Sequence, residues 1–256
     1  MTHETQFEPP PVADAAAQPR AKIFRFRLRT LLIGLALVSV LLAVGTTWLR
    51  NIQRASACRT NLARLGVALL NYELNHGSYP PAWTTDAQGR PETSWRELVA
   101  PYANEIGAYD PRLPWDAPEN QAAARAMTRR LTCADDTSTG ATSYVAVVAD
   151  GFAFQGSRAS TIRDIQDGTS NTILLIEIAD SGIPWHEPRD LTWQEFVDRY
   201  TRRSLGGHAN GFHALMCDGS VRHVRYGEDP AFIRKMFTAG GVELIDVNRA
   251  SSYKAP

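Results

Sequence analysis

The fold is decided by the stretch TLLIGLALVSVLLAVGTTWL, residues 30–49, which contains no charged side chain. A helix of about 20 apolar residues rises about 30 Å, which is the thickness of the hydrocarbon core of a bilayer. Trp48 falls where an aromatic residue would lie at the membrane interface. Core helices are rarely apolar on every face. The stretch therefore predicts a single transmembrane helix over residues 30–49 rather than a buried core helix.

Flanking charge gives this helix an orientation. The basic residues before it are crowded: Arg20, Lys22, Arg25, Arg27 and Arg29. Those after it are spread out: Arg50, Arg54, Arg59 and Arg64. The positive-inside rule then places the N-terminus in the cytoplasm and the rest of the chain outside. A cleaved signal peptide is the rival interpretation, but the apolar run is long for one and no small-x-small site is well placed after it. Residues 1–29, which are rich in proline and alanine up to residue 19, are expected to form a disordered cytoplasmic tail with a basic flank.

The helix is predicted to continue beyond the membrane. Small or apolar residues recur at intervals of three and four, at Ala55, Cys58, Leu62, Leu65, Leu69 and Tyr72. This spacing places them on one stripe of a helix. Asn75-His76-Gly77 supplies a stop, so one helix is predicted from about Leu28 to Asn75. Its second half, residues 50–76, is interpreted as a stalk that continues into a globular head of residues 77–256.

The head is expected to be α+β. Residues 144–148 and 172–178 are predicted strands. Residues 94–102 and 229–237 carry capped amphipathic helix patterns, and residues 193–200 carry a further amphipathic pattern. Asp218-Gly219 separates two apolar runs, a pattern typical of a two-residue type I′ hairpin. That hairpin would pair Ala214 with His223 and would place His213 and His223 on opposite faces.

Composition and motifs argue against an enzyme, a metalloprotein or a nucleic-acid-binding protein. Lys and Arg number 27, as do Asp and Glu, so the net charge is zero and no nucleic-acid partner is expected. No nucleophile elbow, phosphate-binding loop or zinc protease motif occurs, and Gly168-Thr169-Ser170-Asn171 does not make Ser170 a nucleophile. His208, His213 and His223 raise the question of a metal, but the opposite faces of the last two argue against one. We expect no catalytic residue, no metal and no cofactor.

The three cysteines leave two interpretations open. Cys58 lies on the stripe of the long helix, and Cys133 lies in an extended segment of the head. Outside the cytoplasm the two could form a disulfide, but two separate buried thiols are an equal alternative. Cys217 is expected to be a small core residue.

Ordered motifs resemble one family, the DUF1559 proteins abundant in planctomycete bacteria. They are Cys58-Arg59-Thr60-Asn61-Leu62, His76-Gly77-Ser78-Tyr79-Pro80-Pro81, Ser94-Trp95-Arg96, Pro114-Trp115-Asp116 with Asn120, Asp167-Gly168-Thr169-Ser170-Asn171-Thr172 with Glu177, and the H-x9-D-G pattern of His208, Asp218 and Gly219. The resemblance implies a pilin-like architecture, in which a long N-terminal transmembrane helix packs on an α+β head with an antiparallel sheet.

The resemblance also implies roles for these residues. His208, Asp218, Gly219 and the Asp167–Asn171 segment (Asp167, Gly168, Thr169, Ser170, Asn171) are expected to be structural rather than catalytic. Because Cys58 and Cys133 match family cysteines, a disulfide between them is expected, with Cys217 free. At the prepilin cleavage site the family glycine is replaced by Arg25 and the position-five glutamate by Thr30. An uncleaved anchor is therefore predicted.

The resulting functional expectation is not enzymatic. The protein would be a membrane-anchored, pseudopilin-like structural or interaction protein of the bacterial inner membrane, with a periplasmic head. Its partners would be the membrane and, through stalk and head, further copies or other envelope proteins. The alternative, because the family is also classed as solute-binding family 10, is an extracytoplasmic solute-binding module. That role needs an enclosed pocket with convergent polar groups, which tryptophans could line. The candidates are Trp83, Trp95, Trp115, Trp185 and Trp193.

Overall fold

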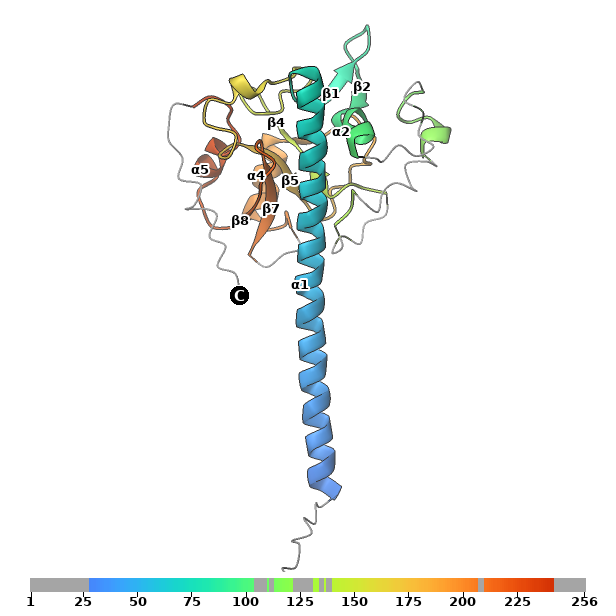
Figure 1. Ribbon diagram of the computed structural model, residues 1–256, viewed down its shortest axis with the longest axis vertical. Helices are drawn as coiled ribbons and strands as arrows, with labels where there is room; N and C mark the ends of the chain where they lie inside the picture. Colours follow the sequence, from blue (N-terminus) through green and yellow to red (C-terminus); the bar gives the residue numbers. More distant parts are fainter. Residues whose placement is uncertain are drawn as a thin grey trace, which may run out of the picture. The chain divides into compact units, whose positions relative to one another are not determined.

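The structure is a computed structural model that describes residues 28–103, 110, 113–121, 131–133, 136, 140–206 and 210–241. It divides into two units, residues 1–47 and residues 48–256. Helix α1 (Leu28–His76) passes through both (Figure 1). The prediction of one long helix ending at about Asn75 is confirmed, as is an α+β head with an antiparallel sheet.

In the first unit, the described residues belong to the first half of α1, and all of them are exposed. Among the described residues, α1 is the helix long and apolar enough to cross a membrane, with a mean hydropathy of 2.2 over its most apolar 18 residues. An apolar helix this close to the N-terminus is either a membrane span or a signal sequence. Ser39, Thr46 and Thr47 donate their hydroxyl groups to backbone carbonyls one turn earlier, so these three hydroxyl groups are satisfied within the helix.

In the residues that the structure describes, the head combines three small sheets with short helices. After α1 come β1 (Trp83–Thr85), β2 (Pro91–Ser94), α2 (Trp95–Val99), the 3-10 turn η1 (Ala100–Ala103), β3 (Tyr144–Val145), β4 (Val147–Val148), the 3-10 turn η3 (Ile162–Asp164), β5 (Ile173–Glu177), β6 (Leu191–Thr192), α4 (Trp193–Thr201), β7 (Gly211–Met216), β8 (Val221–Arg225) and α5 (Pro230–Lys235). The main sheet is antiparallel in the order β3-β5-β7-β8. Strands β1 and β2 form an antiparallel pair, and β4 and β6 a parallel pair.

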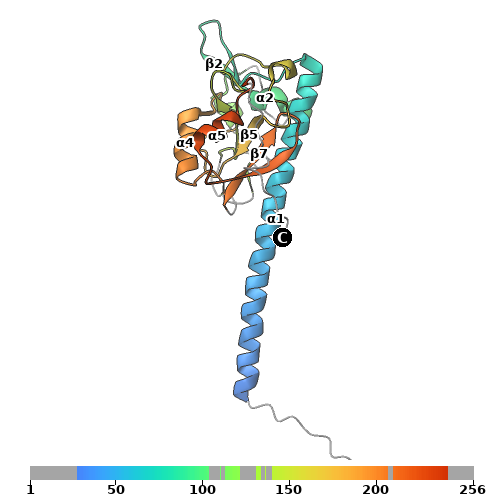
Figure 2. The same cartoon turned by 90° about the vertical axis from the view of Figure 1, so that its left-hand side faces the viewer.

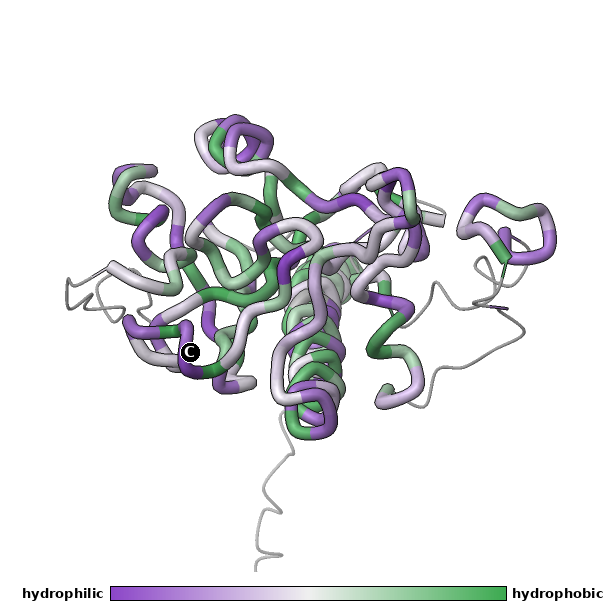
Figure 3. Tube along the Cα trace, turned by 90° about the horizontal axis from the view of Figure 1, so that it is seen from above, coloured by the Kyte–Doolittle hydropathy of each residue, from purple (hydrophilic) through white to green (hydrophobic). Residues whose placement is uncertain are grey.

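The main sheet lies between residues 48–76 of α1 on one side and α4 and α5 on the other (Figure 2). On the α1 side, Leu62 and Leu69 pack with Leu215 of β7 in one core. On the other side, Phe212 of β7 packs with Phe196 of α4 in a second core. Alternate residues of β7 thus serve opposite cores, as the pleat of a strand requires. In Figure 3, hydrophilic residues gather on the outer turns of the head.

Two features of the head differ from the prediction. Residues 144–148 form two strands instead of one, because the Ala146 N–H donates to the Asp190 carboxylate at 2.8 Å and the chain leaves the main sheet there to pair with β6. The turn at Asp218-Gly219 is also not a type I′ turn. Gly219 has a φ of +82°, but Asp218 is not among the residues with positive φ. Met216 accepts from the Gly219 N–H and donates to the Ser220 carbonyl, which encloses a three-residue loop.

This longer loop shifts the register of β7 and β8 by one residue. His213 pairs with His223 and Ala214 with Arg222, so the prediction that His213 and His223 lie on opposite faces is wrong. The two imidazoles lie on the same face, with ring centroids 5.5 Å apart. The physical reason is the Asp218 carboxylate, which accepts from the Ser220 N–H at 2.9 Å and stabilises Asp218 outside the left-handed region.

Candidate functional site

The two glycine-containing motifs meet on the α1 side of the head. The Asp218 N–H donates to the Thr169 carbonyl at 3.0 Å, and the Cys217 N–H donates to the Thr172 carbonyl at 2.9 Å. The Tyr79 hydroxyl donates to the Cys217 carbonyl at 2.6 Å. These bonds join the Asp167–Asn171 segment, the hairpin turn and the segment that follows α1. The hairpin turn is thus a point where three chain segments are joined by hydrogen bonds to backbone groups.

Within the Asp167–Asn171 segment, polar groups bond to backbone. The Asp167 carboxylate accepts from the Gly241 N–H at 3.0 Å and from the Thr238 hydroxyl at 3.2 Å. The Asn171 amide donates to the Asp167 carbonyl at 2.9 Å, which closes the turn over Gly168 at a φ of +91°. Thr169 contributes the carbonyl that meets Asp218, and Ser170 is partly buried in the same turn.

The Ser94-Trp95-Arg96 motif builds a buried ion pair. Ser94 caps α2, and both the Trp95 indole N–H, at 3.1 Å, and the Arg96 guanidinium donate to the Asp190 carboxylate. The Arg96 and Asp190 side chains are both fully buried. This arrangement ties α2 to the chain between β5 and β6.

The Pro114-Trp115-Asp116 motif is closed by Asn120. The Asn120 amide donates to the carbonyls of Asp110 and Pro114, and its oxygen accepts from the Asp110 N–H at 2.9 Å. Asn120 is fully buried, so its hydrogen bonds replace those it would make with water. His208, the remaining motif residue, lies outside the described residues.

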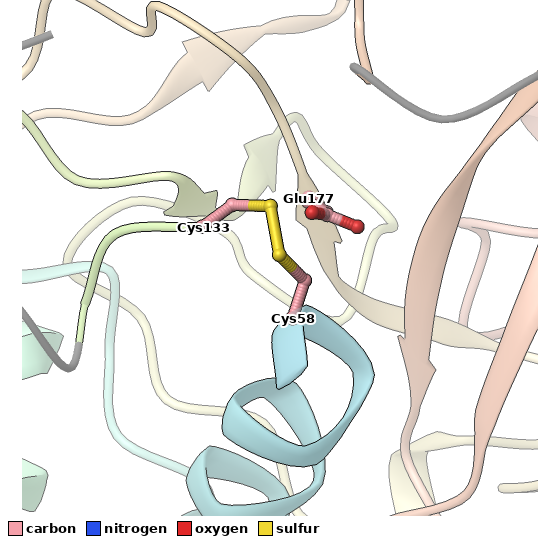
Figure 4. A group of neighbouring side chains, drawn as sticks. All are labelled: Cys58, Cys133 and Glu177. Atoms are coloured by element: carbon pink, nitrogen blue, oxygen red, sulfur yellow. A yellow bond between two sulfur atoms is a disulfide. The ribbon is translucent and has the colours of Figure 1, made fainter. Parts of the chain in front are cut away.

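A second cluster surrounds the cysteines. Cys58 of α1 and Cys133 are joined by a disulfide, with Cα atoms 5.0 Å apart, and Cys217 is a free buried thiol. The Cys133 N–H donates to the Ser143 hydroxyl at 2.8 Å, and that hydroxyl donates to Asp136 at 2.7 Å. The Glu177 side chain of β5 lies beside the bridge (Figure 4). One ligand atom of each of Cys58, Cys133 and Glu177 lies within 4.8 Å of the other two.

Glu177 and His213 form a hydrogen-bonded pair at the edge of this cluster. The Nδ1 atom of His213 lies 2.6 Å from a Glu177 carboxylate oxygen, and both side chains are buried. Sequence reasoning missed this pair, because Glu177 appeared only as the last letter of a motif. A usable signal was present: Glu177 ends an otherwise apolar strand, and a carboxylate in a buried strand requires a partner.

A cavity of about 460 Å³ lies between the β1–β2 hairpin and the Trp115 segment. Its lining includes Asp86, Arg90, Glu92, Glu97 and Asp116, beside the single tryptophan Trp115. Trp95 and Trp185 are buried in the core instead, while Trp83 and Trp193 pack against the cores and are partly buried. Of the five tryptophans proposed to line a pocket, only Trp115 lines this cavity.

The comparisons with known proteins give one match. Residues 49–160 match the family model SBP_bac_10, described as a protein of unknown function (DUF1559). A search of curated proteins found no match. A search of solved structures found none either. The matched segment includes Cys58, the Ser94-Trp95-Arg96 motif and Cys133, and ends before the Asp167–Asn171 segment. The resemblance inferred from the motifs is thus confirmed over residues 49–160, which match the DUF1559 family model.

Proposed function

We propose that the protein is a membrane-anchored, pseudopilin-like structural or interaction protein of the bacterial envelope and has no enzymatic activity. The observation that supports this most directly is the continuity of α1. Its first half is apolar and exposed, whereas its second half contributes Leu62, Leu65 and Leu69 to the core of the head. The first half of this helix can therefore lie in the membrane while its second half packs in the core of the head.

The described motif residues support a structural role. Asn171 and Asp218 make hydrogen bonds within turns, the Asp167 carboxylate bonds to the distant Gly241 backbone, and Gly168 and Gly219 supply the positive φ that the two turns need. The α1 face turned away from the core also carries apolar side chains, with Val67 59% and Leu74 79% exposed. These residues are seven positions apart and lie on one side of the helix, where a neighbouring helix can contact them.

In this proposal, the chain crosses the inner membrane once, with its N-terminus in the cytoplasm and its head in the periplasm. The test places a photo-crosslinking residue at Val67 or Leu74 in membranes, with exposed Arg202 as the matched control position. Adducts between two copies at Val67 and Leu74, but not at Arg202, are expected. Alkaline extraction of the protein from membranes, or equal crosslinking at all three positions, would contradict the proposal.

The cavity beside Trp115 favours a second candidate function, binding of a small cationic solute. Its volume falls within the usual range of ligand sites, and acidic side chains outnumber Arg90 in its lining. A ring such as that of Trp115 attracts cations across its face. Thermal stabilisation by a small organic amine that disappears in Asp116→Asn would support this candidate, whereas identical shifts in Asp116→Asn and in the control Asp150→Asn would contradict it.

A further inference from the structure

The cluster around the disulfide has the chemistry of a metal site. Two sulfurs and a carboxylate oxygen lie within 4.8 Å of one another, and all three residues are buried (Figure 4). Glu177 ends strand β5 with its carboxylate beside the two sulfurs, and His213 supports that carboxylate from 2.6 Å away. We propose that, when the Cys58–Cys133 bridge is reduced, Cys58, Cys133 and Glu177 bind a zinc ion, which is released when the bridge re-forms.

The geometry requires only side-chain movement. Zinc–sulfur bonds of about 2.3 Å and a zinc–oxygen bond of about 2.1 Å place tetrahedral ligand atoms about 3.5–3.8 Å apart. The three ligand atoms already lie within 4.8 Å, and rotation about the Cα–Cβ bonds of the two cysteines separates their sulfurs. Three protein ligands leave the fourth position for water.

Charge favours a cation at this position. Zinc binds the thiolate form of cysteine, and two thiolates beside the Glu177 carboxylate in a buried site would repel one another without a cation. A divalent ion removes that repulsion. Thiolate ligands select zinc over the hard cations magnesium and calcium, while the carboxylate is a ligand that zinc also accepts.

In this proposal His213 does not bind the zinc ion itself but supports the Glu177 carboxylate that does. Its Nδ1 atom lies 2.6 Å from the Glu177 carboxylate, so it fixes the orientation of that carboxylate beside the sulfurs. Carboxylates that bind metals are ordinarily held by such a hydrogen bond. His223, whose ring centroid lies 5.5 Å from that of His213, covers the same face of the sheet.

The redox step balances with a dithiol reductant as the co-reactant. One of its thiolates attacks a sulfur of the bridge, the Cys58–Cys133 bond breaks, and a mixed disulfide forms. The second reductant thiolate then displaces the protein sulfur. The reductant, having lost two electrons, becomes a disulfide, while Cys58 and Cys133 become the two thiolates that bind zinc. In the reverse direction, a disulfide oxidant takes the two electrons and zinc leaves.

The experiment uses the full chain in detergent, either oxidised or reduced with a phosphine that is then removed without oxygen. The expected result is one zinc per reduced chain and none per oxidised chain. Zinc should also raise the thermal midpoint of the reduced protein only. Cobalt in place of zinc should give a sulfur-to-cobalt charge-transfer band. Zinc binding by the oxidised protein, or no zinc and no thermal shift in the reduced protein, would overturn the proposal.

Zinc affinities of substituted proteins test which side chains bind the ion. Cys58→Ser and Cys133→Ser should abolish binding, Glu177→Gln should weaken it at least tenfold, and His213→Gln should weaken it about 10–100-fold as an outer-shell change. The matched controls Cys217→Ser and Glu187→Gln should bind like the parent. Circular dichroism of each oxidised variant checks the fold, and Glu177→Asp serves if Glu177→Gln does not fold. Unchanged affinity and cobalt spectrum in both Glu177 variants, or loss in Cys217→Ser, would refute the assignment.

Discussion

The backbone N–H of Asp218 donates a 3.0 Å hydrogen bond to the carbonyl oxygen of Thr169, which joins two turns that are 49 positions apart in the sequence. The combined junction packs on α1, since a Cβ at Gly66 would lie 2.7 Å from Leu215 and 3.3 Å from the Gly219 carbonyl. The two D-G motifs and the Leu-Gly segment of α1 therefore form one packing unit.

Replacing Gly219 with valine should destabilise the head by about 1 kcal/mol or more, because a β-branched residue resists positive φ. The φ of Gly219 is +82°, and a Cβ there would lie 2.8 Å from the Leu70 side chain. Gly89, with a φ of +80° and open space around it, is the matched control. Urea unfolding should show a larger loss for Gly219→Val than for Gly89→Val. Equal losses would mean that contact with Leu70 has no effect.

Arg96→Met should cost about 3–5 kcal/mol, because it leaves the Asp190 carboxylate buried without its ion pair. Asp190→Asn should be similarly harmful, and the double variant should lose less than the sum of the two. The surface pair of exposed Arg90 and half-buried Asp86 is the control, and Arg90→Met should have no measurable effect on the unfolding midpoint. Additive losses at Arg96 and Asp190 would show that the two side chains are not coupled.

Mass spectrometry of non-reduced peptides should find Cys58 bonded to Cys133 and Cys217 free. Removing the bridge with Cys58→Ser and Cys133→Ser together should cost about 2–4 kcal/mol, since the bond restricts the unfolded chain. Cys217→Ser, which leaves the bridge intact, is the control. Three free thiols in the exported protein would contradict the prediction.

Acid should destabilise the head through His186. Burial lowers the pKa of His186 below its usual value near 6.5, so the folded state binds a proton less readily than the unfolded state. Stability is then fully present above about pH 6.5 and falls as the pH drops through the interval between the two pKa values. His186→Gln should flatten this dependence, measured as urea midpoints at about pH 5 and pH 7.5, whereas exposed His76→Gln should not. Parallel pH profiles for all three proteins would contradict it.

N-terminal sequencing of protein extracted from membranes should show that the basic residues before the apolar stretch are retained. The physical reason is that Arg25 stands where prepilin processing needs a small residue, and Thr30 lacks the charge of the family glutamate. An Arg25→Gly and Thr30→Glu variant, which restores the family pattern, is the matched comparison. A mature parent chain that starts at Phe26 would contradict the prediction and support filament assembly.

Sequence patterns within a few residues correctly predicted the extent of α1 and the N-terminal caps of two short helices. The extent of α1 followed from apolar spacing and the stop near Gly77, and the caps at Ser94 and Asp229 followed from side chains that can accept backbone N–H groups. The ladder between β7 and β8 was predicted as a hairpin, but its register was wrong by one residue. That error arose because Asp218 bonds to Ser220 and thereby selects a three-residue loop, a choice that a D-G pair alone does not reveal.

The described parts of the candidate sites depend on contacts between distant residues, which periodicity does not encode. Trp95 and Arg96 meet Asp190 across more than 90 positions, and Glu177 meets His213 across 36. The parallel pairing of β4 with β6 has the same origin, since it follows from the Asp190 contact with Ala146. The motifs pointed to important residues, but only the folded chain shows which partner each one has.

The bridge between Cys58 and Cys133 also has a mechanical consequence. Cys58 is the first buried residue among the described positions of α1, and 75 positions separate it from Cys133. Tension applied from the N-terminal side travels along the backbone to Cys58, crosses the sulfur–sulfur bond and re-enters the backbone at Cys133. Residues 59–132 form a closed loop that lies outside this path. A pull on the N-terminal helix would therefore leave residues 59–76 of α1, and α2, unstretched and would act on the main sheet instead.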